Sequence, residues 1–164
     1  MNVNPLLGST SDARTLTMAG VRIRFLVSAE QSGGQWSFLK YTAPPRFPGP
    51  QPHLHRQTTE LFYVLEGQLN VRLGDQESIL TSGGFVLVPP GSVHSFSNPS
   101  TEPVRFLIQM SPGGAEGYFT ALSEMIQNAP SWPLPDMRPV AALAERFDTF
   151  SPPVLRTGEA GAEA

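Results

Sequence analysis

Short segments rich in β-branched and aromatic residues recur along the first two thirds of the chain. They are expected to form strands over residues 21–27, 36–42, 60–65, 68–73, 78–81, 85–88, 93–97 and 104–110. Turn-forming residues separate them, as in Pro89-Pro90-Gly91, where the backbone must reverse. Many short strands at such spacing predict an all-β barrel or sandwich.

The first of these segments alternates cationic with apolar side chains. Arg22 and Arg24 fall between Val21, Ile23 and Phe25, which is typical of a strand with one face in the core and the other in solvent. We therefore expect 21–27 to be a strand at the edge of a sheet, with both arginines solvated.

The pattern changes to helical spacing after residue 110. Apolar residues favour an amphipathic helix over 115–128, and Pro130 forbids its continuation. A second short helix is expected over 139–147, with Pro139 at a first helical position. We expect an N-terminal arm over 1–18, one domain over 19–153 that includes both helices, and a small, polar, disordered tail over 154–164.

Composition narrows the class of protein. A chain of 164 residues suits one compact domain, and a net charge of −3 gives no basic surface for a nucleic-acid partner. The absence of cysteine excludes disulfides, a thiolate nucleophile and cysteine-based metal sites. No apolar stretch approaches the roughly 20 residues that span a bilayer, and the start of the chain lacks the apolar core of a signal peptide. We expect a cytoplasmic protein with no membrane partner.

The chain contains only three histidines, and two of them form His53-Leu54-His55. Residues two apart in a strand share a face, so both imidazoles can meet one ion. Glu60 has the wrong parity for a continuous strand with His55, which requires a bend through 56–59 to return its carboxylate. The third histidine, His94, follows the turn at 89–91. Three neutral imidazoles and one carboxylate suit Mn, Fe, Co, Ni, Cu or Zn rather than Mg or Ca.

Two segments resemble the sequence motifs of the cupin family. Residues 53–67 resemble the first motif, in which two histidines separated by one residue are followed by a glutamate and then by a glycine seven residues beyond it. Residues 83–98 match the second motif at its fixed positions, which are Gly83, Pro89, Gly91, His94 and Asn98. One departure is visible, because the glycine that usually stands six residues before the first histidine would fall at Phe47, and Gly49 is displaced from it.

This resemblance implies a fold and a ligand set. The fold would be a double-stranded β-helix, or jelly-roll barrel, followed by one or two short C-terminal helices. The ligands of one divalent transition-metal ion would be His53, His55, Glu60 and His94, with open coordination positions for water, dioxygen or substrate. The resemblance also implies a homodimer, and we expect the strand at 21–27 to offer an edge for it.

The wider layout of the chain is similar to one-domain bacterial cupins of the quercetin 2,3-dioxygenase type. The similar features are residues 30–36 with a Pro-rich approach to the histidines, residues 111–116 leading into a Tyr118-Phe119 helix, and Pro135-Asp136 before the last helix. The similarity implies a dioxygenase acting on a flavonol-like or other enol or aromatic small molecule. Glu60 would then be both a metal ligand and the catalytic general base.

Two other classes of function remain open. A non-redox isomerase, epimerase or cyclase would use the ion as a Lewis acid, although the single lysine, Lys40, makes a sugar-phosphate isomerase less attractive. A cupin that binds a small molecule without turnover is the second alternative.

The side chain of Gln51 could face the metal. Several residues could line an apolar pocket, although core packing is the expected role for most: Trp36, Phe38, Tyr63, Phe96, Phe106 and Met110.

Overall fold

The computed structural model describes residues 3–152, so the tail expected over 154–164 lies outside the described residues. The elements are β1 (Arg14–Met18), β2 (Val21–Val27), β3 (Ser37–Ala43), β4 (Leu54–His55), β5 (Thr59–Glu66), β6 (Leu69–Leu73), β7 (Gln76–Leu80), β8 (Phe85–Val88), β9 (His94–Ser97), β10 (Val104–Ser111), α1 (Ala115–Gln127), α2 (Arg138–Glu145) and β11 (Thr149–Phe150). All eight expected strands and both expected helices are present, with ends that differ from the prediction by at most two residues.

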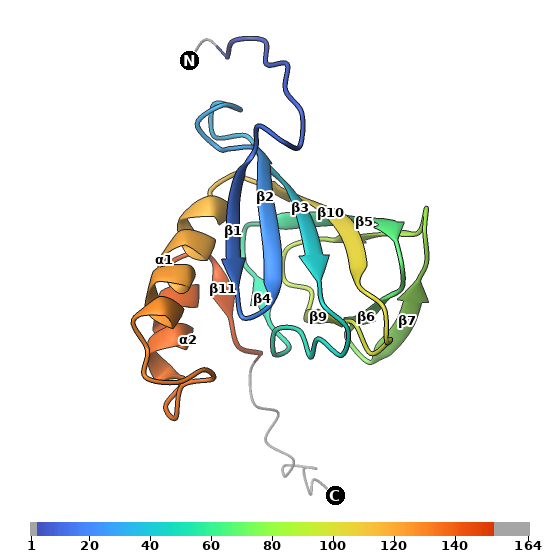
Figure 1. Cartoon of the computed structure of the whole chain (residues 1–164), viewed down its shortest axis with the longest axis vertical. Coiled ribbons are helices and arrows are strands. Elements are labelled where there is room, and N and C mark those ends of the chain that lie inside the picture. The colour runs from blue at the N-terminus through green and yellow to red at the C-terminus, as the bar shows by residue number, and fades with distance from the viewer. Residues whose placement is uncertain (1–2, 153–164) are drawn as a thin grey trace, which may run out of the picture.

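The strands form two antiparallel sheets around one core. The larger sheet has the strand order β1-β2-β3-β10-β5-β8, and the smaller has the order β7-β6-β9. A third, two-stranded pairing joins β11 to β4. Figure 1 shows both helices on one side of the strands, with α1 next to β1 and α2 next to β11. This is the expected all-β jelly-roll architecture with two C-terminal helices.

Aromatic side chains pack between the two sheets. Phe106 of β10 stacks on Tyr41 of β3 with 4.9 Å between ring centroids, and the Phe96 ring of β9 lies 5.5 Å from that of Phe106. Phe62 of β5 lies 5.5 Å from Phe96 as well. Because Phe96 is two residues from His94, this packing also fixes the strand that carries the third histidine.

Helix α1 packs on the larger sheet. The Phe119 ring lies 6.4 Å from both Phe25 and Tyr41. In the first turn of the helix, the Glu116 carboxylate accepts hydrogen bonds from the Ala29 backbone N–H and the Ser37 hydroxyl. Among the described residues, no helix has the length and apolar character needed to cross a membrane.

The prediction that β2 lies at a sheet edge is wrong. It pairs with β1 on one side and with β3 on the other. The β1 segment escaped prediction because Leu16 and Met18 are its only apolar residues, too few to mark a strand. Arg22 is exposed, as expected for the outward face of β2. Arg24 was also expected to be solvated, but it is half-buried.

The segment that leads to the first histidine lies along β9. Phe47 forms a bridge with Asn98, and His53 forms one with His94. Between them, Gly49 has a φ of 77°, and a Cβ at that position would overlap the carbonyl oxygen of Phe96. This close approach is a physical reason for a glycine at position 49 and not at position 47.

Candidate metal centre

The paired backbones of residues 53 and 94 set the spacing of two candidate ligands. The backbone N–H of His53 donates to the carbonyl of His94 at 3.0 Å, and the N–H of His94 donates back at 2.8 Å. The two ring centroids are 4.3 Å apart. The His55 ring lies 5.3 Å from His53, so the alternation expected for an extended segment brings all three imidazoles together.

The bend required between His55 and Glu60 forms around the carboxylate of Asp148. The backbone N–H groups of residues 56–58 donate to its two oxygens over distances of 2.8 to 3.0 Å. The hydroxyl of Thr58 also donates to Oδ2, at 2.9 Å. The chain then enters β5 with Glu60 at an inward position.

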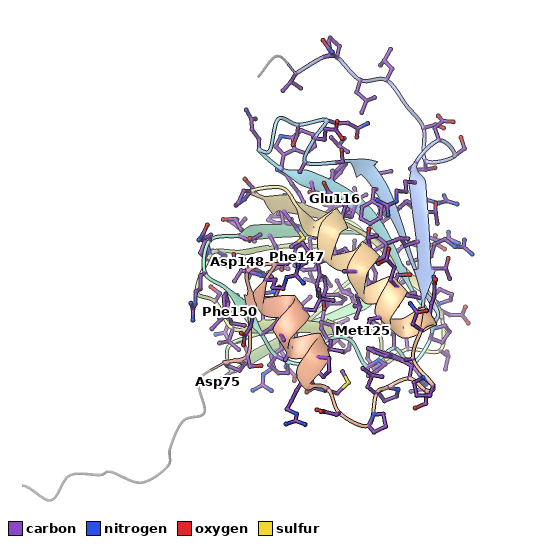
Figure 2. The ribbon with its side chains drawn as sticks, turned by 90° about the vertical axis from the view of Figure 1, so that its left-hand side faces the viewer. Asp75, Glu116, Met125, Phe147, Asp148 and Phe150 are labelled. Carbon is purple, nitrogen blue, oxygen red and sulfur yellow. The ribbon has the colours of Figure 1, made fainter. Side chains whose placement is uncertain are left out.

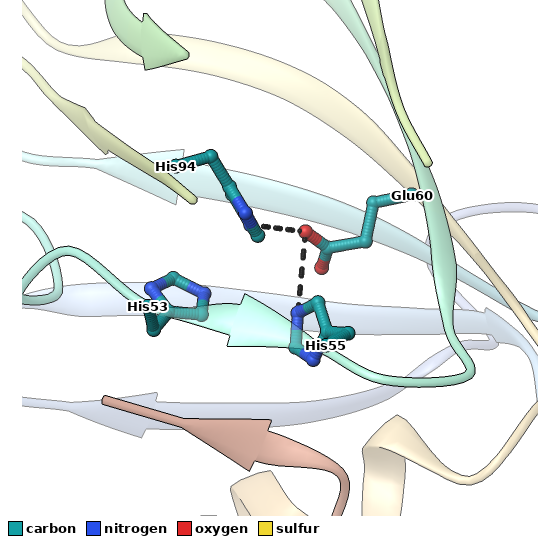
Figure 3. A group of neighbouring side chains, drawn as sticks. All are labelled: His53, His55, Glu60 and His94. Atoms are coloured by element: carbon teal, nitrogen blue, oxygen red, sulfur yellow. Dashed lines mark hydrogen bonds and ion pairs between the residues drawn. The ribbon is translucent and has the colours of Figure 1, made fainter. Parts of the chain in front are cut away.

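The four side chains converge on one point, as Figure 3 shows. One candidate ligand atom from each of His53, His55, Glu60 and His94 lies within 4.8 Å of the others. Glu60 Oε2 is 2.7 Å from His94 Nε2 and 3.5 Å from His55 Nε2. Glu60, His55 and His94 are 5%, 3% and 1% exposed, whereas His53 is half-buried. The cluster is therefore most accessible next to His53.

Each imidazole is oriented by a hydrogen bond between Nδ1 and a backbone carbonyl. The distances are 2.9, 2.8 and 3.0 Å, for His53 to Gln51, His55 to Asp148 and His94 to Ser92. An imidazole that donates from Nδ1 has, in its neutral form, its lone pair on Nε2, so in that form each of the three rings presents Nε2 as a ligand atom. Such outer hydrogen bonds are typical of metal-ligating histidines.

Burial and neighbouring groups set the charges of the cluster. Burial, together with the adjacent His94 imidazole, lowers the pKa of His53 to about 4. Burial alone would raise the pKa of Glu60, but the contacts with His55 and His94 outweigh it and lower this pKa to about 2. Burial likewise opposes the charged form of His55, yet the Glu60 carboxylate raises its pKa. At neutral pH the centre therefore contains an ionised carboxylate and a neutral His53.

The residues present fit a transition-metal ion. His55 Nε2 is buried and lacks a hydrogen-bond partner within residues 3–152. A buried polar atom without a partner is costly, and a cation between His55 and the Glu60 carboxylate would satisfy both. Three nitrogens and one carboxylate oxygen form a donor set suited to Mn, Fe, Co, Ni, Cu or Zn, and this set does not select among them.

Gln51, Trp36 and Phe38 were weaker candidates for the site. The side chain of Gln51 is exposed, and its backbone carbonyl accepts the hydrogen bond that orients His53. Trp36 and Phe38 pack edge to face against each other with 6.5 Å between ring centroids.

The remaining pocket candidates divide between core, surface and site. Phe106 is fully buried in the core, Phe96 packs against that core, and Tyr63 is exposed on the outer face of β5. Met110 of β10 lies opposite Glu60 in the ladder, which places the two side chains on the same inward face. Met110 also packs against the core, and of these residues it is the one paired with Glu60 across the strands.

Asp148 is a residue of the centre that sequence reasoning missed. It is 92 positions from Arg56, and no motif marks it. Its backbone φ of 58° is left-handed, a conformation that Asp and Asn adopt more readily than other non-glycine residues. Partial burial would raise the pKa of its carboxyl, but the hydrogen bonds from Gln57, Thr58 and Arg56 lower it. The only signal for Asp148 in the sequence was that it is an acidic residue just beyond the second helix.

The fold and the four-residue cluster are those that the resemblance to the cupin family implies. Residues 40–110, which include all four candidate ligands, match the family described as Cupin domain. The chain is also 31% identical over 121 residues to quercetin 2,3-dioxygenase of Bacillus subtilis (strain 168), a match that covers 73% of this chain and 34% of that protein. The chain therefore contains a cupin domain and resembles quercetinase-like proteins, although it spans only about a third of that relative.

Solved structures share the fold at low sequence identity. A protein described as a predicted oxalate decarboxylase from Thermotoga maritima superposes with a TM-score of 0.60 at 18% identity, over 65% of this chain and 99% of that one. The polyketide cyclase RemF from Streptomyces resistomycificus superposes with a TM-score of 0.58 at 19% identity, over 66% and 80% of the two chains. These similarities extend to the fold and not to the reaction.

Proposed function

We propose that this chain is a metal-dependent dioxygenase that acts on a flavonol-like or other enol or aromatic small molecule. The observation that carries the proposal is the buried Glu60 carboxylate, whose Oε2 lies within 2.7 and 3.5 Å of two imidazole Nε2 atoms. It is an ionised base held at the point where the candidate ligands converge. The similarity to the Bacillus quercetin 2,3-dioxygenase supports the substrate class.

The side chains have distinct roles in this proposal. When bound, the metal ion supplies a Lewis acid that makes a coordinated hydroxyl group more acidic. The three imidazoles and the Glu60 carboxylate would hold that ion, and each imidazole is kept in place by its Nδ1 hydrogen bond. The Glu60 carboxylate accepts the hydroxyl proton of the substrate. Met110, on the same inward face, contacts the apolar body of the substrate.

Oxygen uptake tests the proposed reaction. Protein loaded separately with each candidate metal is expected to consume dioxygen when a flavonol such as quercetin is added, and chelated protein is expected to consume none. The measurement is made with an oxygen electrode over a panel of flavonols and related enols. Turnover of a substrate without oxygen uptake would contradict the proposal and favour an isomerase, epimerase or cyclase. Tight binding without turnover would favour a binding module.

We also propose a homodimer, formed through the outer face of β5 and β8 rather than through β2. β8 is the last strand of the larger sheet, and exposed apolar side chains lie opposite each other across these strands, Leu61 with Leu87 and Tyr63 with Phe85. Exposed apolar patches of this kind are typical of contacts between proteins. A two-fold contact between copies would cover the same patch on both.

Solution mass tests the dimer. At micromolar concentration, light scattering is expected to give twice the 17.8 kDa mass of one chain. Phe85→Ser is expected to shift the protein toward monomer. Ile79→Ser is the matched control, because Ile79 is 63% exposed and Phe85 is 66% exposed, but Ile79 belongs to the smaller sheet. A monomeric wild-type protein, or equal effects of both substitutions, would contradict this interface.

A further inference from the structure

Asp148 contacts the ligand segment through two different groups. Its backbone carbonyl accepts the hydrogen bond from His55 Nδ1 at 2.8 Å. Its carboxylate accepts hydrogen bonds from three successive backbone N–H groups at residues 56–58. One residue therefore governs both the orientation of His55 and the path of the chain from His55 to Glu60.

The Asp148 carboxylate accepts hydrogen bonds from buried donors that solvent water does not reach. Thr58 is only 7% exposed, and both its N–H and its hydroxyl donate to Asp148 Oδ2. A buried donor that loses its acceptor is strongly unfavourable, so the bend would rearrange to find new partners. Glu60 follows Thr58 by two residues, and a rearranged bend would displace its carboxylate from the imidazoles.

Asp148 is anchored on its N-terminal side by packing against α1. The Phe147 ring lies 6.1 Å from the Tyr118 ring, and a Cβ at Gly117 would lie 2.6 Å from Phe147 Cε1. The ring therefore lies directly against the helix backbone, and a side chain at position 117 would displace it. Figure 2 shows Phe147 and Asp148 beside α2, near α1.

The C-terminal side of Asp148 is anchored on the ligand segment itself. Thr149 pairs with His55 and Phe150 with Leu54 in the β11–β4 ladder. The Arg56 guanidinium lies 3.9 Å from the centre of the Phe150 ring, which is a cation–π contact. Residues 147–150 thus connect α1 to the bend and hold the Asp148 carboxylate between them.

We propose that Asp148 is a positioning residue of the metal centre, whose carboxylate holds the bend at residues 56–58 so that His55 and Glu60 meet the same ion. The C-terminal segment 147–150 then completes a site whose four ligands all come from the barrel. This inference rests on the proposed metal-dependent function, and it assigns Asp148 no contact with the metal or the substrate.

Substitutions at position 148 test the inference through metal affinity. Asp148→Gly removes the carboxylate but tolerates the left-handed φ and keeps the backbone carbonyl for His55. It is expected to weaken Co²⁺ binding by about 10- to 100-fold, as loss of outer-shell partners typically does. The visible absorption bands of the bound Co²⁺ are also expected to shift, because the Glu60 oxygen would leave its position.

Asp148→Asn provides a rescue. Its amide oxygen can take the position of Oδ2 and accept the three hydrogen bonds made there, so only the bond from the Arg56 N–H is lost. The affinity for Co²⁺ is expected to fall between those of the wild type and Asp148→Gly. Asp136→Asn is the matched control, because the Asp136 carboxylate accepts hydrogen bonds from Arg138 away from the ligand bend. It is expected to bind Co²⁺ as the wild type does.

The measurement is a Co²⁺ titration followed by calorimetry and visible absorption, with circular dichroism to establish that each metal-free variant is folded. Equal affinity and equal spectra for the wild type and Asp148→Gly would overturn the inference. If Asp148→Gly does not fold, a folded Asp148→Asn variant with wild-type affinity and spectrum would overturn it. A wild-type protein that binds no Co²⁺ or other candidate metal would instead remove the proposed function, and the inference with it.

Discussion

Glu60→Gln is expected to lower the rate of oxygen uptake per bound metal by about 10²- to 10⁴-fold, the usual effect of removing a general base. The amide keeps the shape of the side chain and can still donate or accept a hydrogen bond, but it cannot take a proton from the substrate. Three imidazoles remain to retain part of the metal. The expected result is therefore a loss of turnover that exceeds the loss of metal occupancy, measured on the same preparations.

Equal metal loading is essential to this comparison, because losing a charged ligand also weakens binding. Glu66→Gln is the matched control, since Glu66 is on the same strand but is exposed and paired with Arg105. It is expected to leave both rate and metal content unchanged. If Glu60→Gln turned over at the wild-type rate per bound metal, Glu60 would not be the base, and a Lewis-acid reaction or a binding role would become the better account.

Gly49→Ala is expected to destabilise the fold by about 4 kcal/mol, in the range reached when a substitution forces strain into the structure. The new Cβ would overlap the Phe96 carbonyl oxygen, so the approach segment would have to separate from β9. That separation would also displace His53, which bridges to His94 four residues further along. Urea unfolding of the metal-free protein measures the first effect, and a metal titration measures the second.

Gly34→Ala is the control that separates the steric overlap of the new Cβ from the cost of placing alanine at a left-handed φ. Gly34 has a φ of 84°, close to the 77° of Gly49, but a Cβ there would meet nothing within 4 Å. It is expected to cost only the left-handed penalty of about 1–2 kcal/mol. Equal destabilisation by the two substitutions would show that the close approach to Phe96 contributes nothing.

The strands that were predictable from sequence are those whose ends are marked by turn residues. β2 and β8 match the predicted ranges at both ends, because a segment rich in apolar residues is bounded on each side by glycine, proline or a polar residue. β4 and β11 contain two residues each and exist only because they pair with each other. No local pattern can mark such strands, and the position of β2 inside the sheet depended on the equally inconspicuous β1.

The residues of the site also divide into those that a local sequence pattern marks and those whose role depends on distant parts of the chain. The cluster of candidate ligands was predictable because His53, His55, Glu60 and His94 occur at motif spacing, and the structure brings the four side chains together. The carbonyls that orient the imidazoles could not be predicted, since a backbone oxygen has no sequence signal. Asp148 could not be predicted either, because its role depends on how the C-terminal segment docks on a bend that is distant in the chain.

The central claim is that His53, His55, Glu60 and His94 hold one transition-metal ion. Anomalous diffraction at the absorption edge of the metal, from crystals of metal-loaded protein, tests it most directly. The account predicts one strong peak, with the three Nε2 atoms and a Glu60 oxygen at about 2.0–2.2 Å if the ion is similar in size to zinc. A fully loaded protein whose anomalous peak lies elsewhere, with these four side chains pointing apart, would contradict it.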